Sequence, residues 1–370
     1  MIYLDNAATT WPKPPEVIAA VAAAMETAGS LGRSGHSHSL LASEIAYECR
    51  CLAGNIFDIA PEQVVFTMNA THGLNIAINT LIDPGDEVIV SGFEHNAVMR
   101  PLYAKRAKIR IAGRKLFDVL DTIEAFDQAV TDHTKAVICT HVSNVFGYIL
   151  PIEEISRICS DRGVPLIIDA AQSAGILPVS ASKLNAAFIA MPGHKGLFGP
   201  QGTGLLLCRH TPRPFLYGGT GSVSKSMQMP DDLPDRVEAG TQNIHGIAGL
   251  LAGLRFVAGH EPHRISEHET ALIMRAVKNL SENKQLKVFY SSKKAQSGVL
   301  SFIHQKIPSQ IFAELFSAAG IAVRTGLHCA PVAHESAGTL SAGTVRVSVS
   351  LFSEADEIDR FCQFVNNVKI

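Results

Sequence analysis

The sequence Leu166-Ile167-Ile168-Asp169-Ala170-Ala171-Gln172 decides the fold class, because a wholly apolar run ends in a single carboxylate. Strands that are apolar throughout are typical of sheets covered on both faces. Five more runs are expected as strands, at 64–67, 88–90, 135–140, 187–190 and 204–208. Helical patterns lie between them, at about 71–82, 95–106, 119–130 and 153–162. This alternation predicts an α/β fold built on a large, doubly wound, mostly parallel sheet.

The sequence after about residue 250 has a different character. Helical patterns at 242–259 and 264–281 are followed by shorter strand patterns at 298–303 and 344–349 and by a last amphipathic helix. We therefore expect a smaller C-terminal α+β domain. The predicted limits are 14–250 for the large domain, and 1–13 together with 251–370 for the small one. The stretch 218–235, rich in Gly, Ser, Met, Asp and Pro, is expected to be a surface loop.

Composition and charge narrow the possible functions. The chain has 370 residues, of which 46% are hydrophobic, and 32 basic against 34 acidic residues leave a net charge of −2. Neither nucleic acid nor an anionic membrane is expected as a partner. The longest apolar run, Val17 to Met25, is too short to span a bilayer, and the N-terminus does not resemble a secretory signal. A cytoplasmic location is the expectation.

One of the seven cysteines differs from the rest. The odd count and irregular spacing predict no disulfide framework. Six cysteines lie in apolar or helical stretches and are expected to be small buried hydrophobes. Cys329 instead lies in Arg324-Thr325-Gly326-Leu327-His328-Cys329-Ala330-Pro331, and an arginine and a histidine in such a loop favour the thiolate.

Two residues that follow predicted strands are candidates for cofactor chemistry. In parallel sheets ligands gather at the carboxyl ends of the strands. Lys195, in Met191-Pro192-Gly193-His194-Lys195-Gly196, has the glycine-lined approach that an amine nucleophile needs, although an ordinary loop lysine is the simpler reading. Asp169 needs a cationic partner if it is buried, and a protonated pyridine nitrogen is one; capping the next helix is the alternative.

Three further candidates carry weaker signals. Thr71, in Asn69-Ala70-Thr71-His72-Gly73, could offer a helix N-terminus to a phosphate or could be a plain N-cap. His95 could stack on a planar ring or be a core histidine. Arg346, inside a predicted strand, could bind a substrate carboxylate or form a buried ion pair. The pair His36 and His38 lacks further ligands with zinc-like spacing, so no metal is expected.

Taken together and in this order, the motifs resemble the class V aminotransferase-like group of fold-type I pyridoxal-phosphate (PLP) enzymes. Within it the chain is most similar to the cysteine desulfurase and selenocysteine lyase family, second group. The resemblance runs from Tyr3-Leu4-Asp5-Asn6-Ala7-Ala8-Thr9 to Arg346-Val347-Ser348. It implies a fold-type I PLP-dependent transferase with PLP as cofactor.

The resemblance also implies roles for single residues around the cofactor. Lys195 would hold PLP covalently, and Asp169 would contact the pyridine nitrogen. The other implied contacts are Gln172 at the phenolic oxygen, His95 stacked on the ring, Asn144 near cofactor and substrate, and His194, Ala70, Thr71 and Thr241 at the phosphate. Since the family takes that last threonine from the neighbouring subunit, a homodimer is expected.

For the reaction, the resemblance implies that Cys329 takes sulfur from L-cysteine as a persulfide, leaving L-alanine. Arg346 would bind the substrate carboxylate, with Arg324 as a further candidate. A sulfur-acceptor protein or a small thiol would then remove the sulfur. The alternatives are a selenocysteine lyase acting on L-selenocysteine, another class V enzyme such as an aminotransferase, and a scaffold without turnover. Pro192 stands where the family often has a phosphate-binding serine, and 330–334 differs from better-known members.

Overall fold

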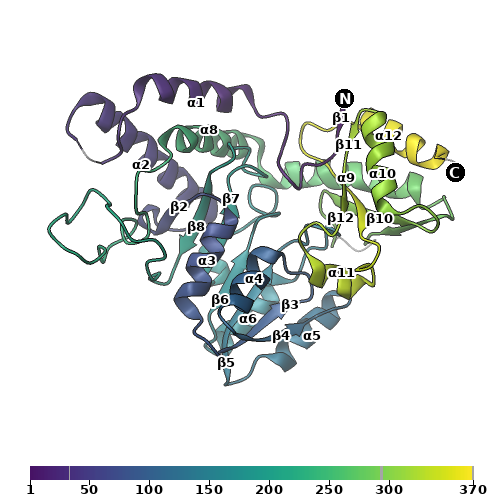
Figure 1. The fold of residues 1–370 in the computed structure, drawn as a ribbon, viewed down its shortest axis with the longest axis horizontal. Coiled ribbons are helices and arrows are strands. Elements are labelled where there is room, and N and C mark those ends of the chain that lie inside the picture. The colour runs from purple at the N-terminus through teal and green to yellow at the C-terminus, as the bar shows by residue number, and fades with distance from the viewer. Residues whose placement is uncertain (33, 292–294, 369–370) are drawn as a thin grey trace.

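The computed structural model describes residues 1–32, 34–291 and 295–368, and a seven-stranded sheet forms its centre (Figure 1). In spatial order the strands are β2 (Val64–Thr67), β8 (Gly204–Cys208), β7 (Phe188–Pro192), β6 (Leu166–Asp169), β5 (Thr134–Thr140), β3 (Glu87–Ser91) and β4 (Lys108–Ala112). β8 runs antiparallel to both of its neighbours, and the pairs from β7 to β4 are parallel. The mostly parallel sheet predicted from the sequence is confirmed.

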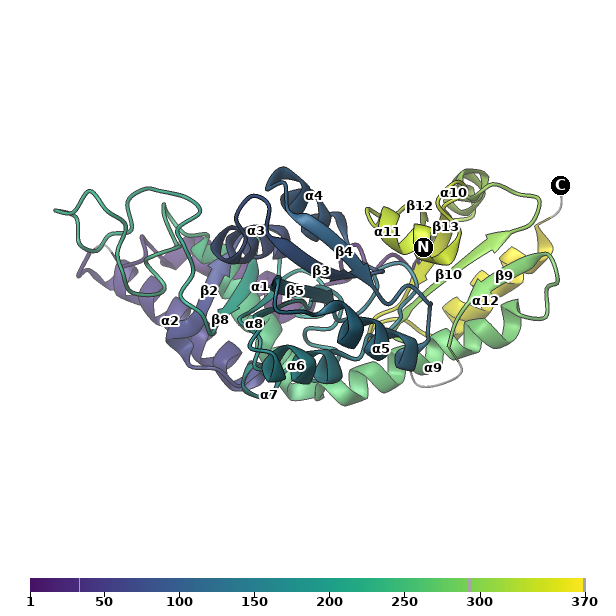
Figure 2. The same cartoon turned by 90° about the horizontal axis from the view of Figure 1, so that it is seen from below.

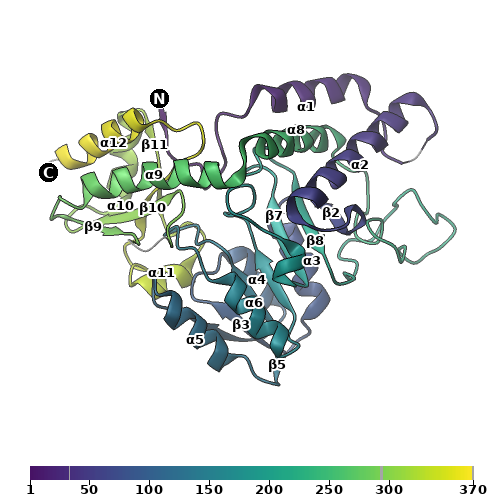
Figure 3. The same ribbon diagram turned by 180° about the vertical axis from the view of Figure 1, so that it is seen from behind.

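Helices cover both faces of this sheet, which explains why its strands are apolar throughout. α3 (Ala70–Leu81) and α4 (Asn96–Ala104) pack on one face. The other face carries α2 (Ser37–Phe57), α5 (Val119–Ala129), α6 (Ile152–Asp161), α7 (Ala181–Leu184) and α8 (Ile244–His260). Figure 3 shows α5 and α6 in front of the sheet and α1 (Pro15–Thr27) lying along α8. A short 3-10 turn, η1 (Pro61–Gln63), leads into β2.

The C-terminal part of the chain builds a second sheet with its own apolar core. The strands β12 (Arg324–Gly326), β13 (Thr344–Ser348), β10 (Val299–His304) and β9 (Leu286–Phe289) pair antiparallel in this order. They pack with α9 (Pro262–Leu280), α10 (Ser309–Ala318) and α12 (Ala355–Asn367), while α11 (Pro331–Ala337) faces the large sheet. Figure 2 shows α9 running along the lower side of this part of the molecule, next to α12. β1 (Ile2–Tyr3) joins this part by pairing with β11 (Ile321–Ala322).

Two features bear on the predicted organisation. β4 was not expected from the sequence, which was read for wholly apolar runs, whereas this edge strand alternates between polar and apolar residues in Lys108-Ile109-Arg110-Ile111, the pattern of a half-buried strand. The proposed domain limit at 250 falls inside α8, so the limits stay a prediction. The described stretch 209–243 contains no helix or strand and projects from the body as a long loop (Figures 1 and 2).

The described residues contain neither a membrane-spanning helix nor a cluster of metal ligands. None of their helices combines the length and apolarity needed to cross a bilayer. Within 1–32, 34–291 and 295–368, no three His, Cys, Asp or Glu side chains gather as metal ligands would.

Candidate active site

A cavity opens at the carboxyl ends of the parallel strands, where ligands of such sheets bind. Eight of the site residues predicted from the sequence line it. They are Ala70, Thr71, His95, Asn144, Asp169, Gln172, His194 and Lys195. The loops after β2, β3, β5, β6 and β7 each contribute at least one of them. The topology therefore gathers residues that are spread over 126 positions of sequence, from 70 to 195, which a reading of single motifs cannot do.

Asp169 ends β6 with a buried carboxyl group. Its side chain is 3% exposed, and Oδ1 accepts a hydrogen bond from the N–H of Ala171 at 2.9 Å. Burial raises the pKa of this carboxyl, which the nearby positive charge of Lys195 partly offsets. Because the hydrogen bond to Oδ1 of Asp169 comes from a neutral amide, this buried carboxyl group is suited to a further, cationic partner in the cavity.

Lys195 follows β7 in a loop with glycine at two positions where a side chain would not fit. A Cβ atom on Gly193 would lie 2.1 Å from Oγ1 of Thr203, and one on Gly196 would lie 2.4 Å from the carbonyl oxygen of Ala174. Burial lowers the pKa of Lys195 to about 8, against the opposing effect of Asp169. A lysine whose pKa lies near neutrality provides the uncharged amine that a nucleophile or base needs.

His95 is held as a neutral ring at the N-terminus of α4. Nδ1 accepts a hydrogen bond from the N–H of Ala97 at 3.0 Å, which leaves the proton on Nε2. Burial first, and then the charge of Lys195, lower the pKa of His95 to about 4. An uncharged imidazole fixed on one edge presents its face and its Nε2–H to the cavity.

Glu94 was missed by sequence reasoning, although it belongs to the same motif as His95. It is fully buried, and Oε1 accepts hydrogen bonds from Oγ of Ser91 at 2.5 Å and from the N–H of Thr140 at 2.8 Å. Burial raises its pKa to about 8. It therefore ties the end of β3 to the end of β5, directly behind the cavity wall. The signal that could have identified Glu94 in the sequence was its position next to the candidate His95.

The N-terminus of α3 is capped by Asn69 and not by Thr71. Oδ1 of Asn69 accepts the N–H of His72 at 2.9 Å, so the plain N-cap reading of Thr71 is wrong. Ala70 and Thr71 occupy the first two helical positions, whose N–H groups have no carbonyl partner within the helix. These amides, the helix dipole and the Thr71 hydroxyl face the cavity as an anion site.

These groups fit the cofactor that the resemblance implies. Asp169 matches a protonated pyridine nitrogen, the face of His95 matches a planar ring, and the start of α3 matches a phosphate. Nδ1 of His194 is buried beside this cavity and has no hydrogen-bond partner in the part of the chain that the structure describes. The site thus holds unsatisfied polar groups at the places where such a cofactor would need them.

A smaller cavity lies on the other side of Lys195 and contains a second buried carboxyl. Glu269, on α9, lines it together with Gln172 and Ser297. Glu269 is 3% exposed, and burial raises its pKa to about 8. Gly298 leaves the space for it, because a Cβ there would lie 2.4 Å from Oε2 of Glu269. Sequence reasoning gave no signal for this residue, which looks like one polar position of an amphipathic helix.

Cys329 lies outside this cavity lining but is anchored to it through the backbone. Its carbonyl oxygen accepts the N–H of Asn96 at 2.8 Å, and the preceding carbonyl, of His328, accepts Nδ2 of Asn144 at 2.8 Å. His328 and Cys329 both have left-handed backbones, with φ of 50° and 57°. Two consecutive non-glycine residues in this region store strain that the surrounding contacts must hold. The thiol itself is exposed, as predicted.

The expected cationic role of His328 is wrong. Its side chain is buried, and Nε2 lies 3.0 Å from Oγ1 of Thr344. Burial, assisted by the charge of Arg346, lowers its pKa to about 2, so the ring is neutral. Arg324 remains as the positive neighbour, with Nη2 at 3.9 Å from Sγ of Cys329.

Arg346 forms the buried ion pair that was one of its two possible readings. It is 1% exposed and bonds Oδ1 of Asp5 through Nη2 at 2.6 Å and the carbonyl oxygen of Asn144 through Nη1 at 3.0 Å. Within the described residues its Nε has no hydrogen-bond partner. The link to Asn144 places this guanidinium directly behind the cavity wall.

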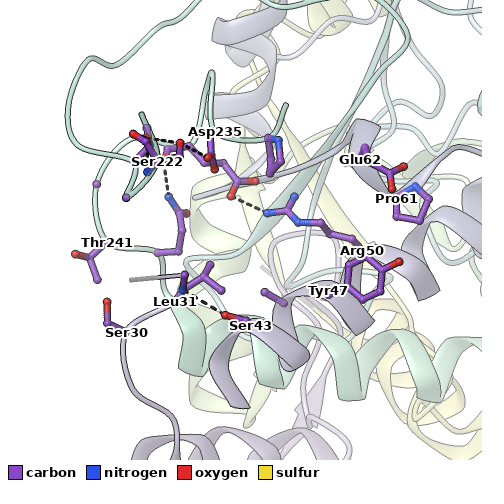
Figure 4. A pocket seen from close by; sticks show the side chains of 18 residues that line it. Ser30, Leu31, Ser43, Tyr47, Arg50, Pro61, Glu62, Ser222, Asp235 and Thr241 are labelled. Carbon is purple, nitrogen blue, oxygen red and sulfur yellow. Dashed lines mark hydrogen bonds and ion pairs between the residues drawn. The ribbon is translucent and has the colours of Figure 1, made fainter. Parts of the chain in front are cut away.

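Thr241 is not part of the Lys195 cavity within one chain. It lines a separate pocket between the start of α2 and the long loop, shown in Figure 4. There Arg50 and Glu238 form a buried ion pair at 2.7 Å, and Ser222 donates a hydrogen bond to Asp235 at 2.5 Å. Thr241 is thus exposed near the end of the projecting loop 209–243.

Comparisons with known proteins agree with this arrangement. The family described as aminotransferase class-V matches residues 2–361. A probable cysteine desulfurase of Methanothermobacter thermautotrophicus is 32% identical over 369 residues, covering 96% of this chain and 92% of its own length. A cysteine desulfurase of Haloferax volcanii is 28% identical, covering 99% and 89%. The apo structure of a cysteine desulfurase from Thermococcus onnurineus NA1 superposes with a TM-score of 0.90 at 30% identity, covering 99% and 94%. The chain belongs to the class-V aminotransferase family and groups there with the cysteine desulfurases.

Proposed function

We propose that this protein is a PLP-dependent cysteine desulfurase that converts L-cysteine to L-alanine and takes the sulfur onto Cys329. The observation that carries the proposal is that the loop with the exposed Cys329 is held beside the Lys195 cavity, because its backbone carbonyls accept hydrogen bonds from Asn96 and Asn144. A transaminase has no use for such a thiol. A scaffold without turnover has no use for the lysine and aspartate behind it.

The residues that would hold PLP are those whose polar groups lack partners or face the cavity. Lys195 would attach it, Asp169 would pair with the ring nitrogen, and His95 would lie against the ring. Ala70 and Thr71 would bind the phosphate through the start of α3. The phosphate-binding serine that the family often has is replaced by Pro192, so α3 would carry more of this binding.

The reaction needs three functions from the chain itself. When bound, PLP supplies an electron sink for bonds at the substrate α-carbon. Lys195, with a pKa of about 8, can take and return the α-proton near neutral pH. The thiolate of Cys329 forms the S–S bond as the carbon–sulfur bond of the substrate breaks. The electron pair stays on the carbon, which is protonated to give the methyl group of alanine.

We further propose a homodimer in which Thr241 completes the phosphate site of the second subunit. The support is that Thr241 lies near the end of the long loop 209–243 and lines a separate surface pocket (Figure 4), while the start of α3 lines the Lys195 cavity. A cytoplasmic location also remains a proposal, supported by seven cysteines without a disulfide among them in the described residues.

The deciding experiment follows alanine release from L-cysteine and from L-selenocysteine by the holoenzyme. Mass spectrometry should find one added sulfur on the Cys329 peptide after reaction with L-cysteine. Cys51→Ala, which removes a partly exposed cysteine of α2, is the matched control and should keep this activity. Alanine release from L-selenocysteine alone would favour a selenocysteine lyase, and release from neither would favour an aminotransferase.

A further inference from the structure

Arg346 already has a carboxylate partner, which bears on how it can bind another one. The N-terminal segment runs alongside β13: the N–H of Ser348 bonds the carbonyl oxygen of Leu4 at 2.8 Å, and Asp5 bridges to Ser348 in parallel register. This pairing places the Asp5 carboxylate against the guanidinium two residues earlier on the strand. The contact is therefore built into the fold and does not depend on a flexible side chain meeting another by chance.

The contact uses only half of one edge of the guanidinium. Nε and Nη2 of an arginine form the edge that a carboxylate can bind with both oxygens. In Arg346, Nη2 bonds Oδ1 of Asp5 at 2.6 Å, whereas Nε is buried without a partner among the described residues. Such an unsatisfied charged donor is costly, so this edge is poised for a ligand that fills both positions.

The local charges also favour a second anion. β12 and β13 are antiparallel, and their register puts Arg324 directly opposite Arg346, which directs both side chains to the same face. Arg324 thus adds a second positive charge near Arg346, whose ion-pair partner is Asp5. Arg346 is 1% exposed, whereas the Asp5 side chain is 22% exposed. Of the two partners, Asp5 is the one with room to move.

We propose that Asp5 is an exchangeable internal ligand of Arg346. It neutralises and orients the buried guanidinium while no substrate is bound, and it yields the Nε–Nη2 edge to the α-carboxylate of the incoming amino acid. Asp5 then acts as a competitor that sets substrate affinity, a positioning role distinct from the chemistry at Lys195 and Cys329. The inference rests on the proposed function, because it takes an α-amino acid as substrate.

The test compares Asp5→Asn with the native holoenzyme by calorimetric binding of L-alanine. The variant keeps the shape of the side chain but removes the competing charge, so L-alanine should bind roughly tenfold more tightly, as loss of one charge-assisted hydrogen bond to the competitor implies. KM for L-cysteine should fall in parallel while kcat changes little. Ethylamine, which is alanine without its carboxylate, should bind both proteins equally.

Asp359→Asn is the matched control, because Asp359 forms an ion pair with Arg275 at 2.6 Å on the exposed surface between α9 and α12. It should leave all these affinities unchanged. Equal or weaker binding of L-alanine by Asp5→Asn would overturn the proposal and make Asp5 a fixed orienting residue. An equal gain for ethylamine would also overturn it.

Should Asp5→Asn fail to fold, a structure of the native holoenzyme with L-alanine decides. Separation of Oδ1 of Asp5 from Nη2 of Arg346 beyond hydrogen-bonding distance supports exchange, and retention of the 2.6 Å contact overturns it. The readout is independent of desulfuration. If no variant released alanine from L-cysteine, the proposed function would fail while the binding comparison would still decide the role of Asp5.

Discussion

Replacing Glu269 by glutamine should stabilise the protein, and only above about pH 5. Glu269 is 3% exposed, and burial raises its pKa from 4.5 to about 8. Between these two values the folded protein keeps the carboxyl proton, whereas the unfolded chain loses it. Ionisation thus stabilises the unfolded state by about 1.4 kcal/mol for each pH unit, and the free energy of unfolding falls as pH rises through this window.

The magnitude follows from the width of the window. At pH 5 the folding free energy lost through Glu269 is under about 1 kcal/mol, and at pH 7 it reaches about 3 kcal/mol. Glutamine has the same shape and never ionises, so Glu269→Gln removes the loss. For 370 residues a gain of 3 kcal/mol corresponds to a rise in Tm of about 4 °C.

The assay is thermal unfolding of both proteins from pH 5 to pH 7.5. Glu267→Gln, an exposed change on the same helix, controls for the loss of one acidic residue. The difference in Tm between Glu269→Gln and the native protein should grow with pH, while the control should show no such growth. A difference that stays constant over this range would refute a buried, protonated Glu269.

Four further predictions concern the proposed reaction and its thiol. Lys195→Ala should abolish turnover and the covalent attachment of PLP that borohydride reduction makes permanent. PLP that borohydride still fixes at the same site in this variant would refute the assignment. Asp169→Asn should fold but lose on the order of 10²-fold in kcat, because a neutral amide cannot stabilise a protonated pyridine nitrogen; near-native kcat would remove Asp169 from the mechanism. Cys329 should alkylate fastest of the seven thiols and Cys139 among the slowest, since burial raises the pKa of Cys139 well above 9.0. Cys329→Ala should stay yellow with PLP but not desulfurate L-cysteine, and mass spectrometry after labelling and turnover checks both.

The elements of the large sheet could be predicted because burial on both faces leaves a local signal. β6 and β8 are runs of apolar residues, and α3 has the helical spacing of a face packed on them. β4 has no such signal, since one side of it faces solvent. The same physics makes four cavity residues candidates from the sequence, because Thr71, His95, Asp169 and Lys195 lie at or after the ends of strands that meet at one edge. The other four, Ala70, Asn144, Gln172 and His194, were expected only from the family resemblance.

The remaining site features depend on contacts between distant segments. No local pattern shows that His328 is buried and neutral, because its position in a loop suggests exposure. Asp5 meets Arg346 across 341 positions of sequence, through a strand pairing that only the fold creates. Glu269 becomes a buried acid because its side of α9 lines the small cavity beside Lys195, together with Gln172 and Ser297, which its amphipathic sequence does not reveal.

The anchoring of the Cys329 loop determines where sulfur can be handed over. The backbone carbonyls of Cys329 and His328 accept hydrogen bonds from Asn96 and Asn144, which fix the position of the loop. A persulfide on Cys329 is therefore held beside the cavity and does not move to a distant carrier. The sulfur must therefore be transferred next to the cavity. We therefore expect the sulfur acceptor to come to Cys329. It would be a small thiol that diffuses to the site or a protein that carries its cysteine on a protruding loop.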